Sequence, residues 1–320
     1  MKKYVYYSTA GIFILFVASL VILFFNTNDK QEMYPIAVTD QAAKQIRIYP
    51  AHENWNEEQP ALWSWRPSSG NGFKGLTWGW GLPNGVKLRQ NDVLGGQHLV
   101  ITDSKGLAAI ISYPNADMKW AKVVGGDPHA AELLPNGNIA VAASKGGWVR
   151  VYASSQSPEA DHYAEYKLPG AHGVLWDPIH EVLWALGDYL LVSLKVEGNE
   201  AKPTLEVETL KNLPSPWGHD LQPVHGNEDR LWVTTGSRVY QYVKSSGKFE
   251  IGYPGYEQVN QSNVKSIGNQ LNGQIVLTRP SENCANDWCT DSINFYMPDF
   301  VRTLTGAQLY KARILNPEYH

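Results

Sequence analysis

The chain has 320 residues, of which 43% are hydrophobic and 18% are charged, and its formal net charge at pH 7 is −4. This balance lacks the basic excess that nucleic-acid binding requires, so we exclude nucleic acid as a partner. The length allows two average domains, although a ring of repeats can occupy most of the chain as one unit. We expect the protein to be monomeric.

The chain begins with a long apolar run. Tyr4–Phe25 contain no charged residue, and about 20 apolar residues suffice to cross a bilayer as a helix. Lys2 and Lys3 precede the run, so the positive-inside rule predicts a cytoplasmic stub at 1–3, a transmembrane signal anchor at 4–25, a tether at 26–33 and an extracytoplasmic domain at 34–320. The alternative is a secreted protein released by signal cleavage, but no small-x-small cleavage site stands out before Asn26.

A hairpin-like unit then recurs about every 45 residues, a spacing typical of propeller blades. In each copy, β-branched and aromatic residues flank a polar turn. The copies are Ile36–Tyr49, Leu99–Tyr113, Ile139–Ala153, Leu183–Leu194, Leu231–Tyr242 and Ile275–Met297. The sequence therefore predicts an all-β fold, a six-bladed β-propeller.

A further short segment precedes most hairpins and is predicted to be the inner strand of its blade. These segments are Gly85–Asn91, Pro128–Asn138, Gly170–Pro178, Gly218–Val224 and Asn263–Gln270. The first hairpin lacks one, and Tyr310–Glu318 repeats the Lys-x-Arg pattern of the segment that begins at Gly85. We expect this C-terminal strand to close blade one, which removes free sheet edges. The alternative makes it the outer strand of blade six.

Three successive inner strands begin with a histidine. His129, His172 and His219 are 43 and 47 residues apart, which matches the blade period, so their imidazoles are expected to converge. Three neutral imidazoles suit a divalent transition metal such as manganese or zinc, with an open position for substrate. Glu132 and Asp220 lie nearby in sequence and can complete the shell or orient an imidazole. The alternative is that the histidines only brace the ring.

The other inner strands carry cations. Lys87, Arg89, Lys265, Lys311 and Arg313 are predicted to line the opposite side of the channel mouth. Arginine binds carboxylates in a bidentate manner, so this side can grip a uronate, phosphate or sulfate, with Lys87, Arg89, Lys265 or Arg313 as base or carboxylate clamp.

A tryptophan-rich insertion separates the first two hairpins. Its loop TWGWGLPNG can place Trp78 and Trp80 at the propeller mouth, where indoles stack on sugar rings. Trp63 and Trp65 are interpreted instead as outer-strand residues that pack between blades.

The two cysteines of the chain, Cys284 and Cys289, lie in one short loop between strands of the last blade. An extracytoplasmic location permits a disulfide between them, and two unpaired thiols are the alternative. Without neighbouring histidines they make a poor zinc site.

The motifs AVTDQ, HAAELLPNGNIAVA, GAHGVLWD, GHDL, LWVTT and VKSIGNQ together resemble a bacterial family of six-bladed propellers catalogued as a domain of unknown function. The resemblance covers the chain from about Tyr34 and implies the fold without a reaction. A more distant similarity, to oligogalacturonate-lyase-type propellers, implies a metal role for the three histidines and a base or clamp role for a lysine or arginine.

We therefore expect a membrane-anchored extracellular propeller that binds an anionic carbohydrate, such as a glycan or cell-wall polymer, in its central channel. One alternative is a metal-dependent polysaccharide lyase that cleaves uronates by β-elimination. Another is a structural or protein-interaction propeller without a small-ligand site.

Overall fold

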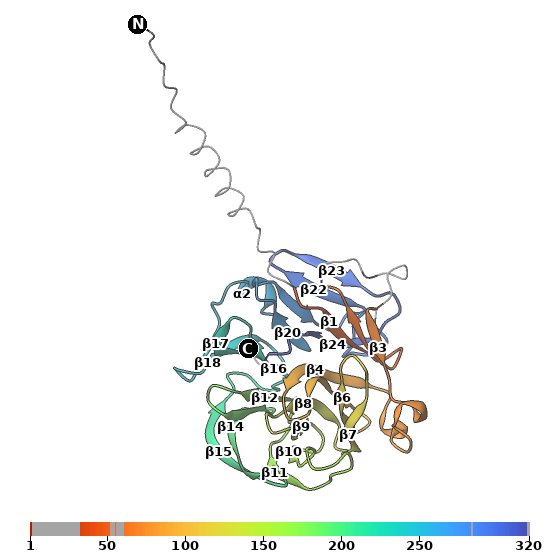
Figure 1. Cartoon of the computed structure of the whole chain (residues 1–320). Helices are drawn as coiled ribbons and strands as arrows, with labels where there is room; N and C mark the ends of the chain where they lie inside the picture. Colours follow the sequence, from red (N-terminus) through yellow and green to blue (C-terminus); the bar gives the residue numbers. More distant parts are fainter. Residues whose placement is uncertain (2–32, 52–54, 56–60, 283, 319–320) are drawn as a thin grey trace. The chain divides into compact units, whose positions relative to one another are not determined.

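Six four-stranded antiparallel sheets follow one another around a ring (Figure 1). The computed structural model describes residues 1, 33–51, 55, 61–282 and 284–318. The chain divides into Met1–Met33 and Tyr34–His320, and the sheets all belong to the second unit. The prediction of an all-β, six-bladed propeller is confirmed.

One strand of each sheet contacts the corresponding strands of both neighbouring sheets, so these six strands surround the axis. They are β4 (Pro83–Asn91), β8 (Pro128–Leu133), β12 (Gly173–Asp177), β16 (Asp220–Val224), β20 (Ser266–Asn269) and β24 (Leu309–Ile314). The second strands are β1 (Ile36–Asp40), β5 (Gly96–Asp103), β9 (Ile139–Ala143), β13 (Val182–Leu186), β17 (Asn227–Thr234) and β21 (Ile275–Thr278).

The two outer layers complete the blades. Third strands are β2 (Gln45–Tyr49), β6 (Leu107–Ser112), β10 (Trp148–Tyr152), β14 (Leu190–Asn199), β18 (Val239–Val243) and β22 (Ser292–Tyr296). Outer strands are β3 (Trp63–Trp65), β7 (Met118–Val123), β11 (Tyr163–Lys167), β15 (Lys202–Asn212), β19 (Lys248–Glu250) and β23 (Phe300–Thr303). Short helices are η1 (Ser69–Asn71), η2 (Thr77–Gly79) and α2 (Tyr256–Val259).

The first sheet joins strands from both ends of the propeller. β24 pairs with β1 in antiparallel register, with Ile314 opposite Ile36 and Arg313 opposite Ala37. Its order is β24-β1-β2-β3, whereas each of the other sheets is built from four consecutive strands.

The hydrophobic core lies between blades. Strand β9, with sequence IAVAA, is buried along its whole length, as expected of a strand covered on both faces, whereas β15 alternates exposed and half-buried side chains. Trp184 and Tyr242 pack edge to face across two blades, with ring centroids 5.4 Å apart. Each fully buried large apolar side chain contributes roughly 1.5–3 kcal/mol, so the ring is stabilised mainly by these contacts.

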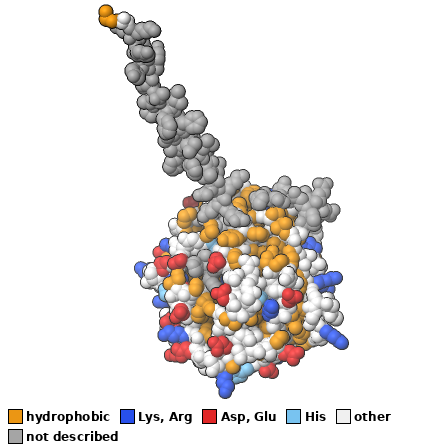
Figure 2. All heavy atoms as spheres, in the orientation of Figure 1, with side chains coloured by type: hydrophobic (Ala, Val, Ile, Leu, Met, Phe, Trp, Pro, Cys, Tyr) orange, Lys and Arg blue, Asp and Glu red, His pale blue; other side chains and the backbone are white. Residues whose placement is uncertain are grey.

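The face drawn in Figure 2 carries acidic and basic side chains interspersed, without a patch of a single sign.

Within the described part of the chain, we find no helix long and apolar enough to cross a membrane. The predicted anchor at 4–25 lies outside the described residues, as does most of the flanking stub and tether.

Candidate functional site at the channel mouth

The structure brings the three predicted histidines together at the end of the channel where the inner strands begin. His129 is the second residue of β8, and His172 and His219 immediately precede β12 and β16. The backbone N–H groups of His172 and His219 donate to Leu186 and Thr234, so both residues sit at equivalent positions of their blades. Ring centroids are 4.4 Å apart for His129 and His172 and 4.8 Å apart for His172 and His219.

Two further residues complete this group. The Tyr310 ring of β24 lies 5.9 Å from the His129 ring and 5.8 Å from the His219 ring. Lys265, directly before β20, places its Nζ 3.5 Å from His219 Nε2. An ammonium can only donate, so His219 Nε2 is an acceptor and the Tyr310 hydroxyl, at 3.0 Å, donates to it. We call His129, His172, His219, Lys265 and Tyr310 the mouth cluster.

The tautomers of two histidines follow from their backbone partners. Nδ1 of His129 lies 2.9 Å from the Asp127 carbonyl oxygen, and Nδ1 of His172 lies 2.7 Å from that of Gly170. A carbonyl only accepts, so both Nδ1 atoms carry a hydrogen. Burial lowers the pKa of each histidine to about 3, so both rings are neutral at pH 7. Their Nε2 atoms therefore offer lone pairs, and no described residue donates a hydrogen bond to them.

His219 is also neutral. Burial and the charge of Lys265 hold its pKa well below the usual range. Its Nδ1 is buried and has no hydrogen-bond partner among the described residues. The mouth cluster thus combines three neutral imidazoles with one ammonium, Lys265, which has no ion pair to a described carboxylate.

These shifts predict that acid destabilises the fold. The folded-state pKa of His172 is about 3, whereas the ordinary pKa of histidine is 6.5, so the unfolded chain binds the proton first as pH falls below 6.5. Stability contributed by neutral His172 is complete above pH 6.5 and declines between there and pH 3. The free energy of unfolding of the wild type should therefore be lower at pH 5 than at pH 7. We expect His172→Gln to make this difference smaller by about 1–2 kcal/mol. Urea denaturation at both pH values measures it.

The matched control is His162→Gln, because His162 is exposed. That variant should keep the wild-type pH dependence. An unchanged pH dependence in His172→Gln would show that His172 titrates normally in the folded protein.

Next to the mouth cluster, the channel is filled by buried ion pairs. Glu132 of β8 accepts hydrogen bonds from Lys87 Nζ at 2.8 Å and from Arg89, whose Nε and Nη2 lie 2.6 and 3.0 Å from the two carboxylate oxygens. Burial alone would raise the pKa of Glu132, but Arg89 and Lys87 lower it below its ordinary value. Burial lowers the pKa of Lys87 to about 8.

A second group of ion pairs surrounds Asp220. Both terminal nitrogens of Arg313 donate hydrogen bonds to the Asp220 carboxylate. Lys311 Nζ lies 3.5 Å from Asp220 Oδ1, and the Ile267 backbone N–H donates to Oδ2 at 3.0 Å. Lys311 Nζ also donates to the His129 carbonyl at 3.3 Å, which links this group to the mouth cluster. Burial lowers the pKa of Lys311 to about 7.

These contacts differ from those expected for the predicted site residues. Four of the cations expected to bind a ligand are paired with carboxylates of the protein itself. They are the predicted clamp residues Lys87, Arg89 and Arg313 and the predicted ligand-binding residue Lys311. Those carboxylates, Glu132 and Asp220, are the groups expected to orient imidazoles. Lys265 differs from the four paired cations, because its Nζ lies 3.5 Å from a histidine ring nitrogen and forms no ion pair with a described carboxylate.

The channel interior leaves little space. A cavity of about 20 Å³ remains beside Lys87, Arg89, Gln222, Gly268 and Arg313, enough for about one water molecule. Small-molecule pockets typically measure ~300–1,000 Å³, so this cavity is too small to hold a sugar.

A larger cavity lies between the fifth and sixth blades, away from the mouth cluster. Its volume is about 410 Å³, and Arg230, Glu250, Gln241, Trp232 and Met297 contribute to its lining. Arg230 is bonded to Glu250 at 2.9 Å and to Gln241 at 3.0 Å. These polar groups satisfy one another, so they do not indicate a ligand.

The two tryptophans predicted to bind ligand differ in exposure. Trp80 is 8% exposed, donates its Nε1–H to the Lys44 carbonyl and packs edge to face on Trp65, so it belongs to the core. Trp78 is 68% exposed in η2. The adjacent Gly79 lies against Val123 of the outer strand β7, which places this turn at the periphery of blade two.

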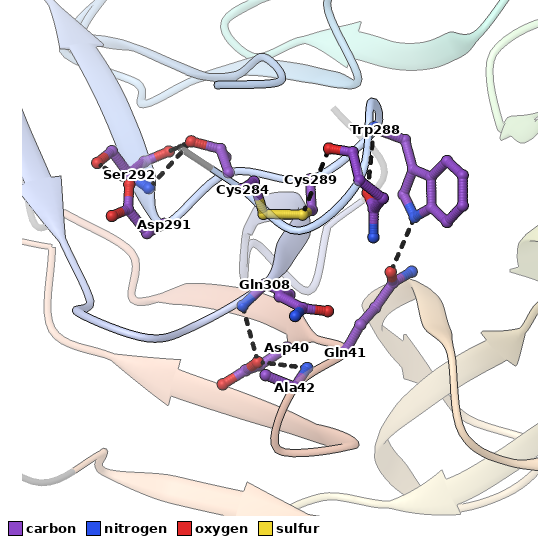
Figure 3. The surroundings of a disulfide bond; sticks show 11 residues. Asp40, Gln41, Ala42, Cys284, Trp288, Cys289, Asp291, Ser292 and Gln308 are labelled. Carbon is purple, nitrogen blue, oxygen red and sulfur yellow. Dashed lines mark hydrogen bonds between the residues drawn. A yellow bond between two sulfur atoms is a disulfide. The ribbon is translucent and has the colours of Figure 1, made fainter. Parts of the chain in front are cut away.

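Cys284 and Cys289 form a disulfide with a Cα–Cα distance of 5.7 Å, in the connection between β21 and β22 (Figure 3). Among the described residues, no group of three or more His, Cys, Asp or Glu side chains is arranged to hold a metal ion. His219 Nε2 is already engaged by Tyr310, so the three imidazoles do not offer three free donors. The manganese or zinc site remains a prediction.

Sequence reasoning missed Tyr310. A tyrosine at the start of an apolar strand is indistinguishable from a packing residue. The signal was its register, because Tyr310 directly precedes Lys311 in the strand that repeats the Lys-x-Arg pattern.

Comparison with one solved structure supports the fold. A protein of unknown function from Bacteroides caccae is 11% identical with a TM-score of 0.57, and the match covers 88% of this chain and 98% of that chain. A catalytically inactive virginiamycin B lyase from Staphylococcus aureus, solved with quinupristin, is 14% identical with a TM-score of 0.47, over 86% of this chain and 85% of that chain. At 11% identity, the likeness to the Bacteroides caccae protein concerns the fold alone.

The comparison with curated proteins gives no match. A family model described as a family of unknown function, DUF6528, matches residues 27–318. This match confirms the resemblance to a propeller family without an assigned reaction. Since it spans nearly the whole sequence, the chain belongs to the DUF6528 family.

Proposed function

We propose that this protein is an extracytoplasmic, membrane-anchored propeller that binds a carboxylate-bearing carbohydrate at the mouth cluster. The observation that carries the proposal is the pairing of two kinds of group. His129 and His172 present unprotonated Nε2 acceptors. Lys265 presents a cation beside the neighbouring His219, without a carboxylate ion pair among the described residues. Sugar hydroxyls donate to the acceptors, and a uronate carboxylate accepts from Lys265.

The proposed location rests on the sequence and the disulfide. The uncharged run Tyr4–Phe25 follows two lysines, which favours a cytoplasmic N-terminus. A disulfide between Cys284 and Cys289 fits an oxidising compartment.

Binding is favoured over catalysis. In a β-elimination, a base would remove the proton next to the carboxylate while the glycosidic C–O bond breaks and its electron pair leaves with the oxygen. His129 and His172 have the Nε2 lone pairs that no described residue engages, but a pKa of about 3 makes them weak bases at neutral pH. The lyase is therefore the less supported alternative.

Isothermal titration with a short galacturonate oligomer and its methyl ester tests the proposal. The ester keeps the sugar and removes the charge. We expect the wild type to prefer the acid, and Lys265→Gln to weaken binding of the acid about 10- to 100-fold, because a charge-assisted hydrogen bond is worth roughly 1.5–3 kcal/mol. Weakening should be small for the ester.

The control is Lys195→Gln, which alters an exposed lysine paired with Glu208 on the outer part of blade four. It should leave both affinities unchanged. Equal affinity of the wild type for acid and ester, or no binding of either, would overturn the proposal.

A further inference from the structure

Two exposed tryptophans lie on the segments that lead to the mouth cluster. Trp217 is 62% exposed and stands two residues before His219. Trp288 is 41% exposed and belongs to the loop closed by the Cys284–Cys289 disulfide. Large indoles left in contact with water are candidates for ligand contact when they adjoin a polar site.

The contacts of Trp288 tie it to the mouth. Its Nε1–H donates to Gln41 Oε1 at 3.1 Å, and Figure 3 shows the indole turned away from the disulfide toward the Gln41 side chain. Gln41 Nε2 in turn donates to the Pro83 carbonyl at 3.4 Å, and the Gln41 backbone N–H donates to the Gln308 carbonyl at 2.8 Å. Pro83 begins β4 and Gln308 precedes β24, so the indole is fixed beside the starting ends of two inner strands.

Asp287, which precedes Trp288, also supports the location of the disulfide loop near the mouth cluster. Asp287 is the carboxylate whose charge acts on Lys265 and opposes the lowering of its pKa by burial. The disulfide loop thus passes near the ammonium of the mouth cluster.

Trp217 is connected to the mouth cluster through a different segment, which contains Gly236. Its ring lies against Gly236, where an added Cβ would be only 2.7 Å from the ring atom Cε3. The Gly236 carbonyl accepts the Asn263 backbone N–H at 3.0 Å, and Asn263 is two residues before Lys265. Trp217 also has φ of 64°, a left-handed conformation that is uncommon for a bulky residue and often marks a functional site.

We propose that Trp217 and Trp288 are stacking platforms for sugar rings on either side of the residue bound at Lys265, so that the ligand is an oligosaccharide rather than a single sugar. This inference rests on the proposed function. The apolar C–H face of a pyranose packs on an indole, while its hydroxyls stay in water. Platforms on two different blades, flanking one cation, recognise a chain that crosses the mouth.

The test compares galacturonate with its oligomers by isothermal titration for the wild type, Trp217→Ala, Trp288→Ala and the control Trp78→Ala. Trp78 is also exposed, at 68%, but lies beside the outer strand β7. We expect oligomer affinity to fall about 3- to 10-fold in each of the first two variants, from the usual worth of an aromatic contact. Affinity for the single sugar should not change, and Trp78→Ala should behave as wild type.

Conservative variants separate stacking from misfolding. Trp217→Phe and Trp288→Phe keep an aromatic face and should recover most of the oligomer affinity. The double variant Cys284→Ser with Cys289→Ser should weaken oligomer binding as Trp288→Ala does, because it releases the loop that positions Trp288.

The outcomes distinguish the two proposals. Wild-type oligomer affinity in both alanine variants, with the dependence on Lys265 intact, overturns the platforms and leaves the uronate site standing. No binding of any galacturonate by the wild type overturns both.

Discussion

Replacing Asp220 with asparagine is expected to lower the free energy of unfolding by about 3–5 kcal/mol, the usual cost of removing one partner of a buried ion pair. Arg313 and Lys311 are 6% and 0% exposed, and Asp220 is the carboxylate that pairs with both. Asparagine retains an oxygen for the Ile267 backbone N–H but no charge. Urea denaturation at pH 6, below the pKa of about 7 of Lys311, measures the loss, with the transition followed by tryptophan fluorescence.

A surface ion pair supplies the comparison. Glu208→Gln breaks a contact to Lys195 in which both side chains are more than a third exposed. Exposed pairs contribute about 0–1 kcal/mol, so this variant should unfold nearly as the wild type does. A loss below about 1 kcal/mol in Asp220→Asn would mean that the buried cations are solvated or neutral, and that the channel is more open than described.

Deleting Leu309–His320 is expected to abolish the folded propeller. The deletion removes β24, which supplies the inner strand of the first sheet, Tyr310 of the mouth cluster and both cations that pair with Asp220. Domains are typically stable by only about 5–15 kcal/mol, and the combined losses approach that range. Circular dichroism and size-exclusion chromatography should show an expanded or aggregated chain. This experiment also tests the predicted closure of blade one.

A complementation experiment supports the interpretation. A synthetic peptide covering 305–320, added during refolding, should restore a compact species. Removal of Glu318–His320 alone keeps every residue of β24 and should have little effect on the thermal transition. A cooperative transition at the wild-type temperature in the longer deletion would show that β24 is dispensable.

The blade pattern was visible in the sequence because it is a local property. Each hairpin combines alternating β-branched and aromatic residues with a short polar turn, and six copies at a regular spacing imply one repeated unit. The convergence of His129, His172 and His219 followed from the same spacing, because equivalent positions of successive blades lie side by side around the axis.

The partners of the charged side chains could not be predicted in this way. Whether Arg313 faces a ligand or Asp220 depends on side chains 93 positions apart in the sequence. The period gives their level along the channel but not their rotamers. Trp80 was likewise ambiguous, because an indole in a glycine-rich loop has the same sequence signature whether it is buried on Trp65 or faces water.

The pairing of β24 with β1 also concerns how the chain is made. The Lys311 backbone contacts Thr39 across 272 positions of sequence, so the partner of β1 is synthesised long after β1 itself. At synthesis rates of about 5–20 residues per second, the edge of β1 stays unpaired for roughly 15–55 s. The ring can close only once β24 is available, so in a polypeptide exported as proposed above, closure follows the passage of β24 across the membrane.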